Sequence, residues 1–525
     1  MAPSWRAGVA RPPLALLAPA LLVGAGMLVP FVYLLARAAE ADAGTLAALV
    51  LRWRTLELVG NTLKLAACVA ALGTLIALPL AWITVRTDLP ARRLFGYLAV
   101  MPLAVPGYVM AYALIGLSGY YGPLNHVFGL TLPRLQGLPG ATLALSLYTF
   151  PYLYLNLRAA LLGLDPSLEE TARSLGRSRA NAFCTVTLPH LRPALLSGWL
   201  VVTLYVLGDF GGVALMRYET FSFAIYNQYA GAFDRVYAAC LSLMLMALAG
   251  AMLMGEGWLS RRRRFGRTGT GVPRAAEPVP LGRWRWPALL FCGLVQLASL
   301  GLPFFVILFW LGRAPAEIDW PALGMVAGRT VLAALPSALF AALLALPVAL
   351  LAARHRGPLA ALAERLSYFG YAVPPLAFAL AAVFFALSAA PFLYQTLPLL
   401  MLAYAFSFLA LAVGPVRSAL LQMGQRPEEA ARSLGRGPLS AFAGATLPRL
   451  ARPLVAGGLL VFIVVVKELP ITFLLAPTGY TTLSMTIFSR TNEGMLLEAA
   501  PYALVTILFS SLFVGLIMRH EGGRH

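Results

Sequence analysis

The chain has 525 residues, of which 60% are hydrophobic and only 12% are charged, and its mean hydropathy is +0.78. Soluble domains carry about 25% charged residues, so an ordinary soluble enzyme is excluded and a protein with many membrane spans is expected. The formal net charge is +19. The basic residues stand in short clusters between apolar runs, which is typical of cytoplasmic loops and argues against nucleic-acid binding.

Twelve apolar runs are long enough, at about 20 residues each, to cross a bilayer. Six lie near residues 13–37, 58–85, 94–117, 141–162, 194–216 and 236–258, and six near 287–312, 328–353, 366–388, 396–421, 453–476 and 499–518. Arginines gather in alternate loops, and the positive-inside rule therefore places both termini in the cytoplasm. The expected fold is an all-α polytopic membrane protein with about twelve transmembrane helices in two tandem sets of six.

The two sets of six runs are repeats. Ala77–Pro79 recurs at Ala345–Pro347, a shift of 268 residues, whereas Pro189 recurs as Pro448, a shift of 259. The difference predicts an insertion in the first half, in the outer loop near 118–140. Because six is an even number, both halves have the same orientation, so a pseudo-two-fold axis along the membrane normal is expected, with a path between the halves.

The strongest motif lies between the fourth and fifth runs of each half. It reads EETARSLG from Glu169 and EEAARSLG from Glu428, and each copy is followed by a Leu-Pro pair at the same distance. Each copy predicts a short helix that begins with acidic residues and turns at its glycine, followed by a helix that returns to the membrane. Pairs between each first glutamate and the arginine four residues on are expected to add about 0.2–0.5 kcal/mol.

This motif resembles the E-A-A-x-x-x-G loop of the permease subunits of binding-protein-dependent ABC importers, and the resemblance covers nearly the whole chain as two fused domains of the type I importer permease fold. Only Thr171 departs, where alanine is usual. The resemblance implies two coupling loops that dock on a separate ATP-binding subunit. Their contact residues would be Glu169, Glu170, Ala172, Gly176, Leu188 and Pro189 in the first half, and Glu428, Glu429, Ala430, Ala431, Gly435, Leu447 and Pro448 in the second.

The resemblance also implies the partners and the location. The partners would be two copies of the ATP-binding subunit, a periplasmic solute-binding protein and the lipid bilayer, and the location would be the bacterial inner membrane. No G-x-x-x-x-G-K-[ST] phosphate loop occurs, because Lys64 precedes Leu65 and Lys467 precedes Glu468. The chain is therefore expected to be no enzyme and to bind no cofactor, with ATP used by the partner subunit.

The predicted domain organisation follows from the runs and the repeats. It consists of an N-terminal cytoplasmic tail, first helix and outside loop (1–56), a first permease domain (57–258, coupling loop about 164–193), a polar cytoplasmic linker (259–285), the first helix of the second half with its outside loop (286–325), a second permease domain (326–518, coupling loop about 423–453) and a cytoplasmic tail (519–525).

Ionisable residues lie deep in the fifth apolar run of each half. Asp209 and Glu468 occupy equivalent positions of the repeat, and Lys467 is adjacent to Glu468. Charge inside a membrane is costly and normally faces a pathway or a partner. Two interpretations are open: these three residues line a translocation path, or they form structural ion pairs, with Arg217 or Arg490 reaching in from outside.

The segments around these carboxylates resemble the fused ferric iron permeases, on the Asp-Phe-Gly at 209–211 and the Lys-Glu-Leu-Pro at 467–470. The implied substrate is Fe³⁺, a hard cation that prefers oxygen ligands. Permeases for thiamine, polyamine, sulfate or organophosphonate share this layout and stay as alternatives, as does a twelve-span secondary transporter. No metal ligands are assigned, and Tyr120 and Tyr121 are interpreted as aromatics of the membrane interface.

Overall fold

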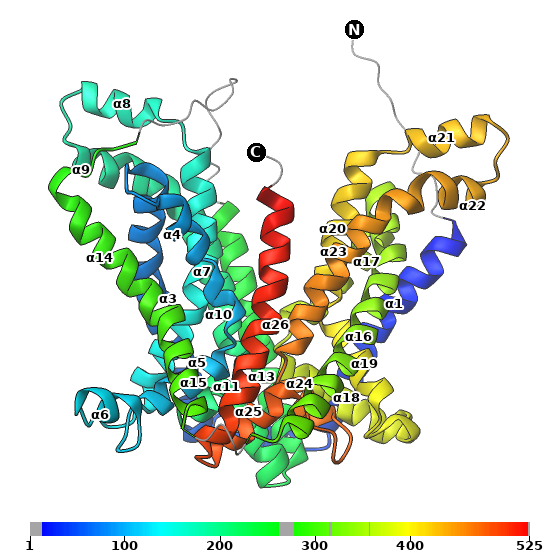
Figure 1. Cartoon of the computed structure of the whole chain (residues 1–525). Coiled ribbons are helices and arrows are strands. Elements are labelled where there is room, and N and C mark those ends of the chain that lie inside the picture. Colours follow the sequence, from blue (N-terminus) through cyan, green and yellow to red (C-terminus); the bar gives the residue numbers. More distant parts are fainter. Residues whose placement is uncertain (1–12, 262–277, 314–317, 356, 523–525) are drawn as a thin grey trace.

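A computed structural model describes residues 13–261, 278–313, 318–355 and 357–522 (Figure 1). Within these ranges the chain is helical, and the one extended pairing is a bridge between Thr87 and Val279. The all-α prediction is confirmed. The start of the predicted N-terminal tail (1–12), the middle of the linker (262–277) and the last three residues of the C-terminal tail lie outside the described residues.

The helices of the first half are α1 (Leu14–Ala38), α2 (Ala43–Val50), α3 (Trp53–Arg86), α4 (Arg92–Leu98), η1 (Met101–Ala104), α5 (Gly107–Leu117), α6 (Pro123–Phe128), α7 (Gly137–Gly163), α8 (Ser167–Ser174), α9 (Arg179–Ala182), η2 (Phe183–Thr187), α10 (Leu188–Gly208), α11 (Gly211–Leu215), α12 (Phe221–Tyr226), η3 (Asn227–Gly231) and α13 (Arg235–Arg261). The first residues of the predicted linker, 259–261, thus still belong to α13.

The helices of the second half are η4 (Gly282–Trp284), α14 (Arg285–Gln296), η5 (Leu297–Gly301), α15 (Leu302–Leu311), α16 (Trp320–Arg354), α17 (Pro358–Ala372), α18 (Pro375–Ala389), η7 (Pro391–Leu393), α19 (Leu397–Ser407), α20 (Leu409–Met423), α21 (Arg426–Ser433), α22 (Pro438–Ala441), η8 (Phe442–Thr446), α23 (Leu447–Val466), α24 (Pro470–Leu475), α25 (Leu483–Asn492) and α26 (Leu496–Gly522).

The helices account for the predicted membrane spans. In the described chain, seven helices are long and apolar enough to cross a bilayer, and three bent pairs of helices bring the number to ten. The two other predicted runs are occupied by α7 and by α26, whose apolar part is Leu496–Leu512. Each of the twelve predicted runs is therefore helical.

Two runs that the sequence predicts as single helices are sharply bent. The run near 94–117 turns by 95° before α5, and the run near 366–388 turns by 106° between α17 and α18. The bends fall at Pro106 and Pro374, and the preceding residues, Val105 and Val373, are extended. Proline has no N–H to donate, and its ring pushes the preceding residue out of the helical conformation. Each of these two predicted spans is therefore a broken helix.

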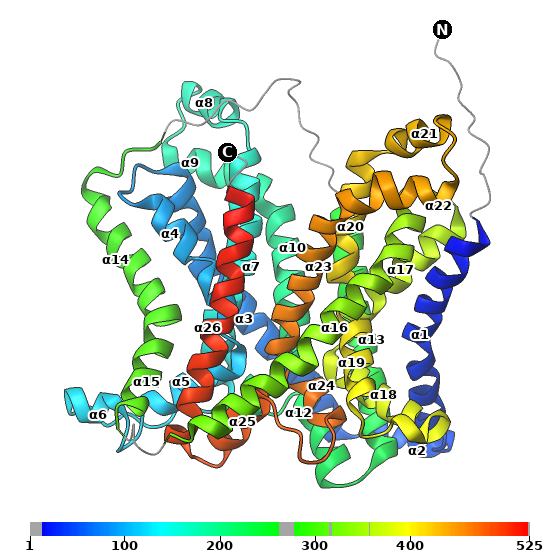
Figure 2. The ribbon, with the colours of Figure 1, turned by 45° about the vertical axis from the view of Figure 1, so that its right-hand side comes forward.

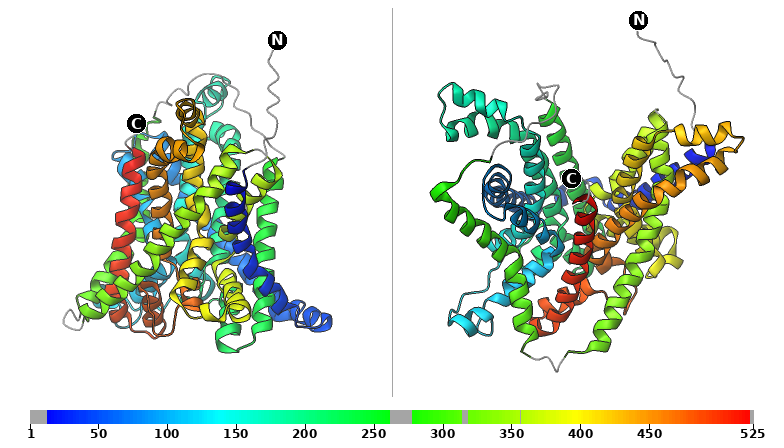
Figure 3. Two further views of the ribbon diagram at one scale, coloured as in Figure 1. Left: turned by 90° about the vertical axis from the view of Figure 1, so that its right-hand side faces the viewer. Right: turned by 45° about the horizontal axis from the view of Figure 1, so that its top comes forward.

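The two repeated loops lie at one end of the molecule and far apart. Figures 1 and 2 show α8 with α9 and α21 with α22 at this end, and α6, within the predicted insertion, at the opposite end. The start of α1 and the end of α26 also lie at the loop end (Figure 3). The two halves splay apart toward the loops and come together at the other end.

The first helix of each half packs against the other half. Helix α1 contacts α16, α17 and α18, while α15 contacts α5 and α14 contacts α3. The Phe31 ring of α1, for example, lies 5.1 Å from the ring of Phe369 in α17. One continuous hydrophobic core therefore runs through both halves, and the cavity described below lies inside this shared packing.

Candidate functional site

The two repeated loops have the same local construction. Helices α8 and α21 each end at a glycine, Gly176 or Gly435, with a φ of 84°. In the first loop the Gly176 N–H donates to the Arg173 carbonyl and the Arg177 N–H to the Ala172 carbonyl, and the second loop repeats both bonds. This left-handed helix end suits a residue without a side chain. The predicted glycine turn is present in both copies.

The two glutamates of each motif have different environments. The first of each pair accepts a hydrogen bond from a threonine hydroxyl at the start of the returning helix, Thr187 to Glu169 and Thr446 to Glu428. The second, Glu170 or Glu429, is exposed. The ion pairs predicted within α8 and α21 do not form in the described structure, because the side chains of Glu169 and Glu428 point toward the returning helix and contact its threonine. Each loop is therefore fixed by its first glutamate, and the second stays accessible to a partner.

The other predicted loop residues divide between the two environments. Ala172 is buried under its helix, whereas Ala430, Gly176 and Gly435 are exposed. The remaining residues range from half-buried to exposed: Ala431, Leu188 and Pro189 are half-buried, and Leu447 and Pro448 are exposed. All thirteen predicted residues thus lie on the two loops, at the end where α8 and α21 stand clear of the other helices (Figure 2).

An arginine holds the second loop. The Arg354 guanidinium, at the end of α16, donates Nη1–H to Glu428 Oε2 at 2.9 Å and Nη2–H to Oε1 at 2.5 Å. Burial by itself raises the pKa of Glu428, but hydrogen bonds from Arg354 and Thr446 and the charge of Arg354 outweigh it and hold this pKa below its ordinary value. The carboxylate is thus ionised, and the pair anchors α21 to α16.

The first loop lacks this anchor. The residue equivalent to Arg354 is Arg86 at the end of α3, and it is only 4% exposed. Its Nε and Nη2 atoms have no hydrogen-bond partner in the described structure, and it forms no ion pair with Glu169 there. The two loops therefore have the same backbone and different attachments.

A cavity of about 390 Å³ lies between the halves. Asp209, Lys467 and Glu468, the three predicted path residues, line it together. The cavity is also lined by six tyrosines that were not predicted from the sequence: Tyr108, Tyr148, Tyr152, Tyr205, Tyr368 and Tyr371. These tyrosines come from four separate segments, so their grouping has no signal in the linear sequence.

Within the part of the chain that the structure describes, Asp209 and Glu468 form no ion pair with Lys467, Arg217 or Arg490. Arg490 pairs with Glu493 and Glu498. The Lys467 ammonium donates to the Leu103 carbonyl oxygen at 2.9 Å. Glu468 is buried and Asp209 is half-buried. Two carboxyl groups and one ammonium group therefore lie on one cavity between the halves.

Each carboxylate stands at a break in a helix, where the sequence predicts a continuous run. Helix α10 ends at Gly208 and α23 at Val466, and the short helices α11 and α24 follow. Asp209 Oδ1 accepts the Val213 N–H at 3.1 Å, and Glu468 Oε1 accepts the Ile471 N–H at 2.9 Å. Both carboxylates thus satisfy amide groups at the start of the next helix, which orients them.

A serine hydroxyl supports each break from the following segment. Ser222 Oγ donates to the Asp209 carbonyl at 2.5 Å, and Ser484 Oγ donates to the Glu468 carbonyl at 2.7 Å. A threonine two residues earlier contacts each serine, Thr220 in the first half and Thr482 in the second. The same network in both halves holds the two carboxylates at equivalent places.

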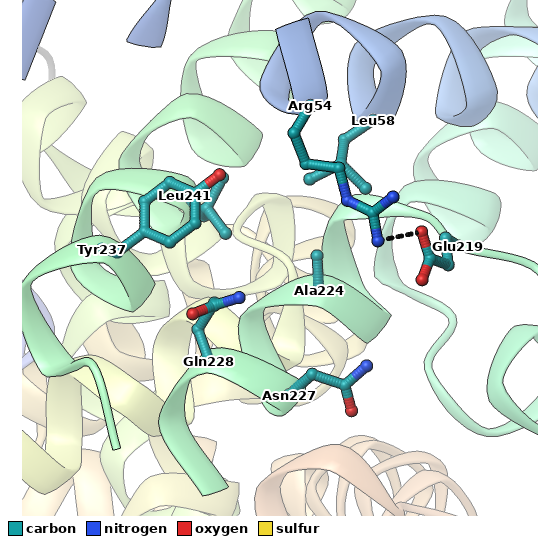
Figure 4. A pocket seen from close by; sticks show the side chains of 8 residues that line it. All are labelled: Arg54, Leu58, Glu219, Ala224, Asn227, Gln228, Tyr237 and Leu241. Carbon is teal, nitrogen blue, oxygen red and sulfur yellow. Dashed lines mark ion pairs between the residues drawn. The ribbon is translucent and has the colours of Figure 1, made fainter. Parts of the chain in front are cut away.

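A second, much smaller pocket lies between α3, α12 and α13 (Figure 4), and α12 is at the end opposite the loops (Figure 2). Its volume is about 50 Å³, and Asn227, Gln228 and Tyr237 are among the residues that line it. Arg54 Nη2 and Glu219 Oε2 form an ion pair of 2.6 Å there, with both side chains about half exposed. Such an exposed pair contributes little stability, and the volume suits about one or two water molecules rather than a solute.

The described residues contain no group of three or more His, Cys, Asp or Glu side chains that could hold a metal ion. The four cysteines form no disulfide, and Cys240 and Cys292 are buried. The two buried cysteines pack as small hydrophobic residues. A metal cargo would need other oxygen donors beside the two carboxylates of the cavity.

Comparisons with known proteins agree with this architecture. Residues 70–265 and 345–520 each match the family described as binding-protein-dependent transport system inner membrane component. A Fe(3+)-transport system permease protein of Haemophilus influenzae is 30% identical over 515 residues, which are 97% of this chain and 99% of that protein.

Shorter relatives match about two fifths of the chain. A molybdenum transport system permease protein of Escherichia coli is 33% identical over 215 residues, 38% of this chain and 93% of that protein. A sulfate transport system permease protein of the same species is 30% identical over 201 residues, 37% of this chain and 71% of that protein. The chain therefore belongs to the inner membrane components of binding-protein-dependent transport systems, as a multi-pass permease in which two copies of the family domain are fused.

Proposed function

We propose that this permease moves ferric iron, delivered by a periplasmic solute-binding protein, into the cytoplasm at the expense of ATP hydrolysed by a separate subunit. The observation that carries the proposal is the cavity between the halves, where the repeat places two carboxyl groups, Asp209 and Glu468. The full-length likeness to a Fe(3+)-transport permease supports the same cargo.

The charges of the cavity favour a cation over an oxyanion. When all three groups are ionised, Asp209 and Glu468 contribute two negative charges and Lys467 one positive charge, so a molybdate or sulfate ion would meet a net negative wall. Unit charges 4 Å apart interact by about 4 kcal/mol at an effective dielectric constant of 20. Oxyanion import is the second candidate, because molybdenum and sulfate permeases match about two fifths of the chain and Lys467 could face an anion.

The two loops provide the contact with the energy source. We place one ATP-binding subunit on each loop, with the exposed Glu170 and Glu429 at the contact. The loop end would then be cytoplasmic, with both termini on the same side. The splay of the halves toward the loops corresponds to an inward-facing state (Figure 1). Closure of the two subunits on ATP would draw the loops together and rock the halves about the cavity.

Uptake by proteoliposomes that contain the permease, its ATPase and its binding protein tests the cargo. We expect ATP-dependent uptake of radioactive iron to fall at least tenfold in Asp209→Asn with Glu468→Gln, with normal assembly. Glu219→Gln serves as the control, because that carboxylate lies outside the cavity. Uptake of iron by the double variant at the wild-type rate would remove the carboxylates from the path. Uptake of molybdate or sulfate instead of iron would show the second candidate to be correct.

Charge reversal at the exposed glutamates tests the coupling. We expect Glu170→Lys combined with Glu429→Lys to abolish co-purification of the ATPase and ATP-driven uptake. The control is Glu493→Lys, an exposed residue in the second half beyond α25. Intact assembly and transport in the double variant would show that the loops are not the contact. Uptake driven by an ion gradient without the ATPase would indicate a secondary transporter.

A further inference from the structure

We propose that the cavity holds ferric iron in transit through four oxygen ligands, the carboxylates of Asp209 and Glu468 and the phenolate oxygens of Tyr108 and Tyr148. This inference rests on the proposed function, since it states how the same cargo is bound. It assigns the two tyrosines as ligands, which the sequence did not indicate.

Tyr108 is the polar group of the cavity that most needs an explanation. Its side chain is 4% exposed, and its hydroxyl group has no hydrogen-bond partner in the described structure. A buried hydroxyl without a partner costs about 1–3 kcal/mol, so such groups are uncommon and call for a ligand or a role. Tyr108 lines the cavity together with Glu468. A Cβ atom at Gly211 would be 2.9 Å from Tyr108 Cβ and 2.6 Å from Cδ2 of Leu469, the residue after Glu468, so Tyr108 lies beside the Glu468 segment.

The second phenol lies beside the other carboxylate. A Cβ atom at Gly107 would be 2.9 Å from Asp209 Oδ2 and 2.8 Å from Tyr148 Cε1. The Asp209 carboxylate and the edge of the Tyr148 ring therefore meet over the same glycine, in the space that its missing side chain leaves. Each carboxylate of the cavity thus has a tyrosine at its side, Tyr108 with Glu468 and Tyr148 with Asp209.

The charges balance when two phenols take part. The two carboxylates and the Lys467 ammonium sum to one negative charge, and two phenolates bring the sum to three, which neutralises Fe³⁺. Each phenol O–H gives its proton to water as its oxygen bonds to iron, and iron stays ferric throughout. Lys467 has no lone pair to offer as an ammonium, and the Leu103 carbonyl holds it. Neutrality matters because net charge inside a membrane is costly.

The same ligands discriminate against anions. Their distribution between the halves also links iron binding to the rocking of the two halves. The deprotonated ligand set carries only negative charge, so it repels an oxyanion. Three ligands belong to the first half, and Glu468 alone belongs to the second; the second-half equivalents of Tyr108 and Tyr148 are Leu376 and Ser407. Rocking of the halves would therefore change the distance between Glu468 and the other three ligands.

Phenolate oxygens bound to ferric iron give a visible charge-transfer absorption, which provides a readout independent of transport. The whole permease with its ATPase, in lipid nanodiscs, is titrated with ferric nitrilotriacetate. We expect the band in the wild type, its loss in Tyr108→Phe with Tyr148→Phe, and a weaker band in each single variant. Phenylalanine keeps the ring and removes only the oxygen. Tyr120→Phe with Tyr121→Phe is the matched control, because both tyrosines are exposed and outside the cavity.

Transport by the same variants separates this inference from the proposed function. We expect the double variant to lose iron uptake at least tenfold while its thermal unfolding matches the wild type. Iron uptake by the wild type without a band, or a band and uptake unchanged in the double variant, would overturn the inference and leave the proposed cargo standing. Absence of iron uptake by the wild type would overturn both. If the double variant does not assemble, the band of Tyr148→Phe decides, because an unchanged band removes that ligand.

Discussion

Neutralising Glu428 should loosen the second loop much more than the same change at Glu169 loosens the first. In Glu428→Gln, Arg354 loses its anionic partner in a pair whose side chains are 17% and 7% exposed. Breaking a buried pair by removing one partner costs about 3–5 kcal/mol. We take the lower end, about 3 kcal/mol, because Arg354 keeps some contact with water.

The first loop provides the comparison within the same molecule. Among the described residues, Glu169 accepts a side-chain hydrogen bond only from the Thr187 hydroxyl, and the glutamine in Glu169→Gln still offers an oxygen to it. The expected cost is that of one weakened hydrogen bond, about 0.5–1.5 kcal/mol. Since about 1.4 kcal/mol is a factor of ten in an equilibrium, local opening should increase about 100-fold at α21 and about tenfold or less at α8.

Hydrogen–deuterium exchange measured by mass spectrometry reads this local opening. The informative peptides cover 426–433 and 167–174, with Glu429→Gln and Glu170→Gln as controls because these glutamates are exposed. Exchange of α21 at the wild-type rate in Glu428→Gln would refute the proposed anchoring by Arg354. An equal increase in exchange rate at α21 in Glu428→Gln and at α8 in Glu169→Gln would refute it as well.

The pKa of Glu428 is lowered in the folded protein, so its contribution to the stability of the second loop is complete above the unfolded pKa of about 4.3 and is lost as the pH falls through the folded pKa. Hydrogen exchange, corrected for the intrinsic rate at each pH, should therefore show that α21 opens in acid before α8 does. Equal pH profiles for the two helices would contradict this expectation. Gly435→Ala should lower stability by about 1 kcal/mol through its positive φ alone. The control is Gly163→Ala at the end of α7, where the backbone is helical and the space is open as at Gly435, so this variant should be no less stable than the wild type. Gly107→Ala should reduce iron uptake by displacing Asp209 and Tyr148, and Gly60→Ala, which meets nothing within 4 Å, should not; equal uptake in both would disprove the close approach.

The amino-acid sequence by itself determined the features that depend on short stretches of chain. Apolar runs give the spans, because a backbone without water must satisfy itself as a helix. The repeated glycine indicates the turn after α8 and α21, because both helix ends close through a residue with positive φ, which glycine adopts without strain. The equivalence of Asp209 and Glu468 is visible as well, since both halves keep the same spacing. The bends at Pro106 and Pro374 could have been predicted from the sequence, because proline disfavours the helical conformation of the residue before it.

The tertiary structure alone decided which groups meet. Arg354 and Glu428 are 74 residues apart, and their pairing depends on where α16 ends beneath α21. Arg86 has the same place in the repeat and no such partner. The cavity tyrosines come from segments on both halves, brought together by helices that cross from one half to the other. A sequence repeat gives the two halves equivalent backbones. Contacts between side chains depend also on how each half packs against its neighbours, and this packing differs between the two halves.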